Sequence, residues 1–240
     1  MVPDEMKSDL EVIAKVADTA RVGLPIAEKT GQPGLAAITF YTDAAGASYT
    51  MVNKQRQYHD NEGKGVACIG GTMMEDIWGW SRLSWPQQLL TGQLDEKGCS
   101  FGSKSTTLEA VGILIPLIVF KEKVSGKEII FKIDNIAVSW GWQRGYVKGD
   151  KTASEILKAA RHMAGLLGST IYIDHVDRMS SEMASLADEL SRREKSKNPE
   201  IAERLKRALY RPVTGYLKRW LENPMAGEDV SYNLLKEIAS

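Results

Sequence analysis

The chain has 240 residues, of which 43% are hydrophobic and 26% charged, and this is typical of a soluble globular protein that is long enough to bury a sizeable core. Its 31 basic and 31 acidic residues balance, so a strongly basic or strongly acidic protein is excluded. No apolar run approaches the roughly 20 residues that a membrane-spanning helix needs, so we expect no membrane partner.

The first 34 residues are predicted to form a helical segment and a linker. Residues 8–22 place their apolar side chains on one helical face, and the Gly- and Pro-rich segment after them is typical of a linker. The acidic and polar start does not have the pattern of a signal peptide. Cys68 and Cys99 have no metal-ligand spacing, so we expect free thiols in a reducing compartment inside the cell, the cytoplasm or the nucleus.

Three strands are predicted after the linker. Residues 35–43, 63–71 and 77–85 are rich in apolar and aromatic residues, and their spacing favours an antiparallel meander. Residues 86–104 have little periodicity and are predicted to form a loop.

Helices and strands alternate in the second half. Residues 105–120 are apolar nearly all round, which is typical of a buried helix, and Pro116 is expected to kink it or to end its regular part. The further predicted elements are a strand at 127–134, a helix at 152–168, a strand at 169–176 and a helix at 180–193. A meander followed by alternating helices and strands predicts an α/β fold with a mixed five-stranded sheet, flanking helices, and N- and C-terminal helical extensions.

Four acidic residues lie at unusual places in these elements. Asp43 and Asp134 each end a predicted strand, Glu109 lies inside the most apolar helix, and Asp188 borders the apolar stripe of the last one. Taken singly, a turn after a strand or a solvated helical face explains such residues. Glu109 fits that explanation least, because its neighbours leave little polar face and an unpaired buried carboxylate is costly.

A divalent metal ion would remove that cost. Hard cations such as Mg²⁺ prefer all-oxygen ligands. Two such ions about 4 Å apart can stabilise both the attacking and the leaving oxygen of a phosphodiester displacement. The small residues "AAGA" after Asp43 would also let a phosphate backbone come close. Taken together, the four acids indicate metal-dependent phosphodiester chemistry.

The order of these acids, and the elements that carry them, resemble the pattern of the ribonuclease H family. The matching pieces are "FYTDAAG", "TTLEAVGILIPL", "FKIDNIAVSWGWQRG" and "IYIDHVDRMSSEMASLADELSRR". The amino-acid sequences of these pieces are similar to the ribonuclease H domain of retroelement reverse transcriptases. Within that group they are similar to the DIRS-like elements, which integrate by a tyrosine recombinase. The resemblance covers residues 36–192 and implies a ribonuclease H-like domain at 35–193, with a helical segment at 1–34 and a basic helical extension at 194–240.

The resemblance implies an enzyme that hydrolyses the RNA strand of RNA–DNA hybrids with two Mg²⁺ ions, for which Mn²⁺ can substitute. Asp43 would bridge both ions, and Asp188 would help to hold the ion that activates the attacking water. Glu109 and Asp134 would help to hold the ion on the leaving-group side. His175 follows the last strand, where the family often has a mobile histidine that assists product release.

Two features depart from the family pattern. His175 and Asp188 are 13 positions apart, which is longer than expected, so a structural role for a histidine at a strand end is an equal alternative. The chain contains no polymerase "YxDD" stretch, so any polymerase partner would lie outside it.

Contacts to nucleic acid are expected at two places. The segment 139–151 mixes aromatic and basic residues, which suits a nucleic-acid backbone, although tryptophans packed on the sheet are an equal alternative. Polar residues near two of the acids are candidates for contacts to the RNA strand, because the 2′-hydroxyl distinguishes RNA from DNA. The predicted nucleic-acid-binding residues are Ser105, Asn135, Trp142, Arg144 and Lys148.

The C-terminal extension is basic. Residues 193–219 contain nine Lys or Arg against three Glu. Such a segment faces a polyanion or forms a solvated helical surface, and charge alone leaves both open.

Two other functions remain open from the sequence. One is a non-catalytic module that binds nucleic acid or a polymerase on an inherited fold. The other is a different nuclease of the same fold, of the resolvase or transposase type. A zinc enzyme is disfavoured, because the three histidines are scattered along the chain.

Overall fold

The computed structural model describes residues 37–59, 63–72, 76–86, 89–90, 104–179 and 181–222. The predicted N-terminal helix and linker, Cys99, nearly all of the predicted loop at 86–104 and the end of the tail lie outside the described residues. None of the described helices is long and apolar enough to cross a membrane.

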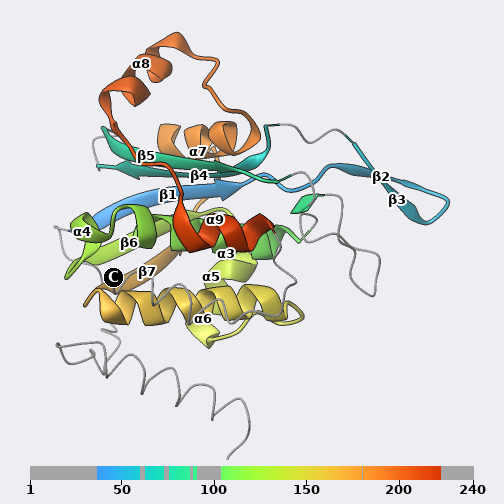
Figure 1. Ribbon diagram of the computed structural model, residues 1–240, viewed down its shortest axis with the longest axis horizontal. Helices are drawn as coiled ribbons and strands as arrows, with labels where there is room; N and C mark the ends of the chain where they lie inside the picture. The colour runs from blue at the N-terminus through green and yellow to red at the C-terminus, as the bar shows by residue number, and fades with distance from the viewer. Residues whose placement is uncertain are drawn as a thin grey trace, which may run out of the picture.

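The core of the fold is a mixed β-sheet with the strand order β7-β6-β1-β4-β5-β8 within the described residues (Figure 1). The meander pairs antiparallel, β1 with β4 and β4 with β5, whereas β6 lies parallel to β1 and β7 parallel to β6. The strands are β1 Ile38–Ala44, β4 Gly65–Gly71, β5 Ile77–Ser84, β6 Glu128–Ile133 and β7 Thr170–His175. This arrangement confirms the predicted mixed sheet.

The sheet is one strand larger than predicted. Strand β8, Leu209–Tyr210, pairs parallel with β5 and adds a sixth strand within the described part of the chain. Its two residues carry no alternation that a sequence pattern could detect, and Tyr210 is placed there by a ring contact of 4.5 Å with Trp80. Tertiary packing therefore decided this strand.

Helices cover both faces of the sheet (Figure 1). One face carries α3 Ser105–Val119, α4 Lys121–Val124, α5 Ile136–Arg144, α6 Lys151–Leu166 and α9 Gly215–Glu222. The other carries α7 Glu182–Arg192 and α8 Pro199–Arg207. Every residue of β4 is buried, because helices lie on both sides of it.

Helix α3 lies between the sheet and α6, which explains why its sequence is apolar nearly all round. Pro116 neither ends it nor removes its last turn, since the helix continues to Val119. Gly112 lets the helix approach the sheet closely, and an added Cβ there would lie 3.2 Å from the Cβ of Thr42 in β1. The helix that carries Glu109 is thus packed directly on the strand that carries Asp43.

A second, two-stranded sheet was not predicted. Strands β2, Tyr49–Val52, and β3, Gln55–Tyr58, form an antiparallel hairpin that follows β1 and projects away from the main sheet (Figure 1). Asn53 and Lys54 both have positive φ, as the two central residues of a type I′ turn require. Lysine is uncommon in that conformation, so the turn signal in the sequence was weak.

Candidate metal centre

The first acid of the candidate site, Asp43, lies near the end of β1 and is buried, with 4% of its surface exposed. Its Oδ2 atom accepts a hydrogen bond from the Ser191 hydroxyl on α7. Strand β1 pairs with β6 on one side and β4 on the other, so its position is set at the middle of the sheet. The sheet therefore gives this carboxylate a rigid support.

The second acid, Glu109, projects from α3 toward the same place. Its Oε1 atom accepts a hydrogen bond of 3.3 Å from the backbone N–H of Ala44, the residue after Asp43. Its Oε2 atom is buried and has no hydrogen-bond partner among the described residues. A buried carboxylate oxygen without a donor is unfavourable and fits a ligand position for a cation.

The third acid, Asp134, directly follows β6. Strands β1 and β6 are parallel neighbours, so their carboxyl ends meet at one edge of the sheet. One carboxylate oxygen from each of Asp43, Glu109 and Asp134 can be chosen so that all three lie within 4.8 Å of one another. We call these three residues the acidic triad. Its ligand atoms are all oxygens and close together, as Mg²⁺ and Mn²⁺ sites require.

The fourth acid, Asp188 on α7, is not part of this close group among the described residues. Its Oδ1 atom lies 2.9 Å from Nη1 of Arg178 and 2.7 Å from Nη2 of Arg192, one turn further along α7. Ser191 donates to Asp43 and to the main-chain carbonyl of Asp188, which keeps the two acids near each other. Asp188 therefore borders the triad and is joined to it through basic and hydroxyl groups.

Arg178 is the residue that sequence reasoning missed. It lies on the connection from β7 to α7, and its guanidinium bonds to Oδ2 of Asp134 through both Nε and Nη2. Its Nη2 also lies 3.8 Å from Oδ1 of Asp43. The only hint in the sequence was the unusually long segment between His175 and Asp188, because the extra residues of that connection place Arg178 beside the acids.

Burial and mutual repulsion raise the pKa values of two triad acids. The pKa of Asp43 is raised to about 6, first by burial and then by the charges of Asp134 and Asp188, against the lowering effects of Ser191 and Arg178. The pKa of Glu109 is raised well above its ordinary value, again first by burial and then by Asp43 and Asp134. A site that raises carboxylate pKa values in this way favours a bound cation over bound protons once the pH is high enough.

His175 is exposed at the end of β7. Its Nε2 atom lies 3.1 Å from the main-chain oxygen of Asp134. This contact is to the backbone and corresponds to the structural alternative, a histidine at a strand end that makes a local hydrogen bond. The contact also keeps the imidazole beside the triad.

The small residues after Asp43 form a supported segment at the edge of the triad. The backbone oxygen of Ala45 accepts a hydrogen bond of 2.9 Å from Nε1 of Trp85, and that of Gly46 accepts one of 3.1 Å from Nζ of Lys64. These two hydrogen bonds fix the backbone of the segment that follows Asp43.

The predicted contacts to nucleic acid lie mainly along α5, which begins at Ile136, two residues after Asp134. Asn135 is the N-cap of this helix, and its Oδ1 atom accepts from the N–H groups of Ala137 and Val138. Its side-chain oxygen is therefore used by the fold. At the other end Arg144 lies 5.2 Å over the exposed ring of Trp140.

The other three predicted contact residues differ in exposure. Trp142 is half-buried, packs against the larger hydrophobic core and lies under Arg161 of α6 at 4.3 Å. Lys148 is exposed after α5, and Ser105 is exposed at the start of α3. The structure thus places Ser105, Arg144 and Lys148 where a bound molecule can reach them.

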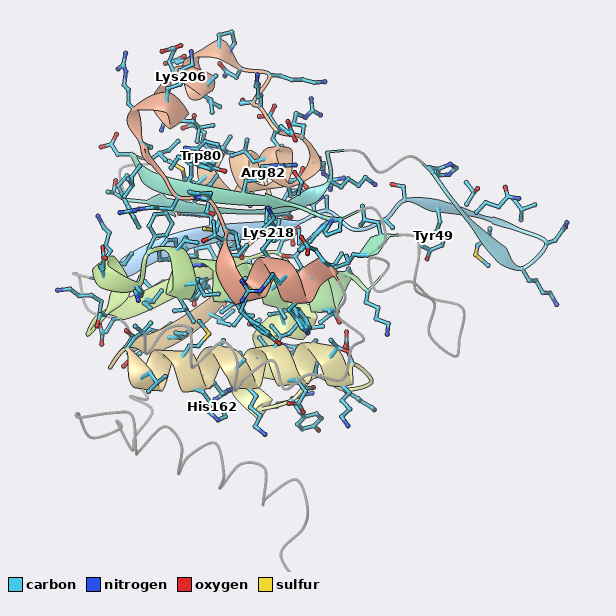
Figure 2. The ribbon with its side chains drawn as sticks, viewed as in Figure 1. Tyr49, Trp80, Arg82, His162, Lys206 and Lys218 are labelled. Carbon is cyan, nitrogen blue, oxygen red and sulfur yellow. The ribbon has the colours of Figure 1, made fainter. Side chains whose placement is uncertain are left out.

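The basic C-terminal extension is divided between the two faces of the sheet. Figure 2 shows Lys206 on α8 beyond the face that carries Trp80 and Arg82, and Lys218 on α9 at the other face. The Trp80 indole donates to the backbone oxygen of Leu205, and Arg82 Nε donates to that of Leu190 at 2.7 Å. The segment therefore presents its basic residues on two separate surfaces.

Comparisons with known proteins give distant likenesses only. No family model matches the chain, and no curated protein matches it. Among solved structures, RNase H1 from Halobacterium salinarum is 16% identical with a TM-score of 0.41, and the match covers 65% of this chain and 97% of that one. The N-terminal RNase H domain of a Mycobacterium tuberculosis protein is 14% identical with a TM-score of 0.40, and the match covers 65% and 94%.

A viral structure belongs to the same set of matches. The foamy viral protease–reverse transcriptase, in complex with an RNA/DNA hybrid, is 13% identical with a TM-score of 0.40, and the match covers 71% of this chain and 22% of that one. The chain thus spans about a fifth of the viral protein. At these identities and TM-scores the likenesses establish neither an activity nor a substrate.

Proposed function

We propose that the chain is a metal-dependent endonuclease that hydrolyses the RNA strand of RNA–DNA hybrids. The single observation that carries the proposal is the convergence of Asp43, Glu109 and Asp134, whose oxygens come within 4.8 Å from three separate elements. Like charges brought together under burial are unfavourable by themselves. A fold that brings such a cluster together from β1, from the end of β6 and from α3 is explained by a cation that the cluster binds.

The residues present fit a hard divalent cation. The donor atoms are carboxylate oxygens, and Glu109 Oε2 is a buried acceptor with no hydrogen-bond partner among the described residues. Two Mg²⁺ ions, or Mn²⁺ in their place, would be held by the triad together with Asp188, and when bound they would supply charge stabilisation for the attacking and leaving oxygens.

The chain's own residues would have different parts. Asp43 would be the shared ligand, since it belongs to the acidic triad and is also joined to Asp188 through Ser191. Ser191 orients its carboxylate. His175, beside the backbone of Asp134, would act near the leaving group and assist product release. The supported segment of small residues after Asp43 would let the scissile phosphate approach.

The proposed binding surface for the hybrid extends from the triad along α5. The helix has nine residues, which corresponds to about 13 Å, so Arg144 and Lys148 would contact backbone phosphates beyond the cleavage point. Ser105 and the remaining N–H groups of the Asn135 amide would contact the RNA strand, where 2′-hydroxyls are available. Trp142, half-buried, would support this surface from below.

We further propose that the nuclease is the ribonuclease H part of a retroelement reverse transcriptase, of the DIRS-like type. The amino-acid sequences of the four acid-bearing segments support this origin. In this proposal residues 35–193 form the nuclease domain, residues 1–34 are a connecting segment, and residues 194–240 are a basic extension. A polymerase partner would then lie outside the chain.

The decisive experiment is cleavage of an end-labelled RNA–DNA hybrid by the purified chain. Cleavage in Mg²⁺ or Mn²⁺, absent in chelator and absent in Asp43→Asn and Asp134→Asn, is the expected result. Asp174→Asn is the matched control, because Asp174 lies on β7 but is exposed and paired with Lys132 at 2.7 Å. A folded preparation that leaves the hybrid intact in both metals would contradict the proposal.

One observation favours a second candidate, a module that binds nucleic acid without cutting it. Arg178 already neutralises part of the acid cluster, which reduces the need for a cation. That candidate predicts hybrid binding that is unchanged in Asp43→Asn and no cleavage. Testing duplex DNA and four-way DNA junctions beside the hybrid separates both candidates from a resolvase- or transposase-type nuclease.

A further inference from the structure

Arg178 contacts three of the four acids of the site. Its guanidinium bonds to Asp134 Oδ2 through Nε at 3.0 Å and through Nη2, reaches Asp188 Oδ1 at 2.9 Å through Nη1, and lies 3.8 Å from Asp43 Oδ1. Arg192, the other basic residue at this site, pairs with Asp188 at 2.7 Å.

These contacts use the atoms that a metal ion would need. A guanidinium carries only donors and stays protonated in proteins, so its positive charge is permanent. A divalent cation held by Asp134 and Asp43 would lie within a few ångströms of it, and like charges at such distances repel strongly where burial lowers the effective dielectric. The guanidinium and the cation therefore cannot both occupy the centre of the acids.

The side chain of Arg178 is free to leave while its backbone stays in place. Its side chain is 42% exposed and so borders solvent, although the carboxylates that it joins are 6%, 19% and 21% exposed. Its main-chain oxygen accepts a hydrogen bond of 3.0 Å from Ser185 on α7, and the N–H of Met179 donates to Asp177 at 2.7 Å. Rotation of the side chain toward water would break none of these backbone contacts.

We propose that Arg178 is an internal competitor of the divalent metal ion, which must displace its guanidinium from Asp134 and Asp188, so that Arg178 sets the metal affinity of the site. This inference rests on the metal site of the proposed function. It adds that the site has two cationic states, one closed by the arginine and one filled by the metal. The arginine state keeps the acids together without metal, and it makes metal binding weaker.

The test is calorimetric titration of Mn²⁺ and Mg²⁺ into chelator-treated full chain, with Arg178→Gln, Arg178→Lys and Arg204→Gln beside the wild type. Arg204 is the matched control, because it pairs with Glu182, which lies on α7 like Asp188, and is outside the acid cluster. Competition predicts that Arg178→Gln binds metal at least about fivefold tighter, as for a typical coupling between two sites. Arg178→Lys should lie between Arg178→Gln and wild type, and Arg204→Gln should match wild type.

A measurement on the wild type keeps the inference testable if the variants fold poorly. The Nε–H signal of Arg178 in an NMR spectrum should move toward the position of a solvated arginine as Mg²⁺ saturates the site. The signals of Arg192 and Arg204 serve as internal references.

The outcomes separate this inference from the metal site itself. Equal or weaker metal binding by folded Arg178→Gln, or an Arg178 signal unchanged at saturation, overturns the competition and leaves the metal site standing. Binding by Arg178→Gln alone supports the competition in its strongest form. An absence of metal binding in both proteins overturns the competition together with the metal-dependent function.

Discussion

Ser191 on α7 donates a hydrogen bond to Asp43 at the end of β1, across 148 positions of the chain. Both residues are buried, at 0% and 4% exposure. The bond joins α7, on one face of the sheet, to Asp43. Helix α3, on the opposite face, places Glu109 next to the same acid. The acids of the site are therefore held from both faces at once.

The first prediction concerns this bond. Since the Ser191 hydroxyl stabilises the ionised form of Asp43, Ser191→Ala should raise the pKa of Asp43 further above about 6. A hydrogen bond to a charged group contributes about 1.5–3 kcal/mol, which corresponds to a rise of roughly one pH unit or more. Titration of the carboxyl ¹³C signal in chelator measures it. Ser196→Ala, which removes a contact to Glu189 instead, should leave the Asp43 curve in place.

The second prediction concerns the stability of the metal-free protein. The pKa of Asp43 is higher in the fold than its ordinary value of 3.8, so the neutral carboxyl favours folding below pH 4 and that contribution is lost as the pH rises through about 6. Asp43→Asn has no carboxylate to ionise, so its free energy of unfolding does not fall in this way as the pH rises. In chelator at pH 8 the variant should be more stable than the wild type by on the order of 3 kcal/mol, at about 1.4 kcal/mol per pKa unit.

Urea unfolding at pH 4 and at pH 8 measures this difference. The gain should be small at pH 4, where Asp43 is protonated in the folded state and only partly ionised in the unfolded chain. Asp174→Asn, an exposed acid in a surface ion pair, should change stability by less than about 1 kcal/mol at either pH. A variant that is destabilised equally at both pH values would show that burial of the Asp43 charge is not the governing effect.

The third prediction concerns the pH dependence of metal binding. Carboxylates bind a metal ion in their ionised form, so Asp43, with a pKa of about 6, must release its proton when metal enters at lower pH. Mn²⁺ affinity should fall by at least about tenfold for each pH unit below 6, because Asp43 releases one proton and Glu109, whose pKa is also raised, adds to the release. Calorimetry in two buffers of different ionisation enthalpy counts the protons released. An affinity that does not change between pH 5 and pH 8 would contradict the prediction.

The fourth prediction concerns the packing of α3 on β1. An alanine at Gly112 would place its Cβ 3.2 Å from Thr42 Cβ and 3.4 Å from Val66 Cγ2, and both neighbours are buried within the sheet. Overpacking costs about 1–3 kcal/mol, and it should exceed the gain of about 1 kcal/mol in helix propensity. Gly112→Ala should therefore lower the free energy of unfolding and weaken metal binding, since it separates Glu109 from Asp43.

The fifth prediction concerns the proposed hybrid surface along α5. The double variant Arg144→Gln, Lys148→Gln should weaken binding of an RNA–DNA hybrid and reduce the salt dependence of binding by up to about two phosphate contacts. Lys127→Gln is the control, since Lys127 is exposed just before β6, at the end of that strand remote from Asp134. Binding by fluorescence anisotropy at several salt concentrations, in chelator, measures both effects. An unchanged salt slope would place the nucleic acid elsewhere.

The sequence by itself determined the order and type of the main elements. Alternation and helical periodicity predicted the strands of the meander, the later parallel strands and the helices α3, α6 and α7, because burial on one or both faces selects these patterns directly. It also identified Glu109 as the acid with the least ordinary explanation, since an acid in an apolar helix is visible without any contact being known.

Only the tertiary structure decided how the acids meet and what else meets them. Parallel pairing of β1 and β6 brings Asp43 and Asp134 to one sheet edge, and the packing of α3 through Gly112 brings Glu109 to them. Arg178 was not predicted, because its role depends on where the β7–α7 connection runs and not on any local pattern. Long-range contacts between charged side chains leave no periodic signal in a sequence. For that reason the guanidinium of Arg178 among the acids became visible only in three dimensions.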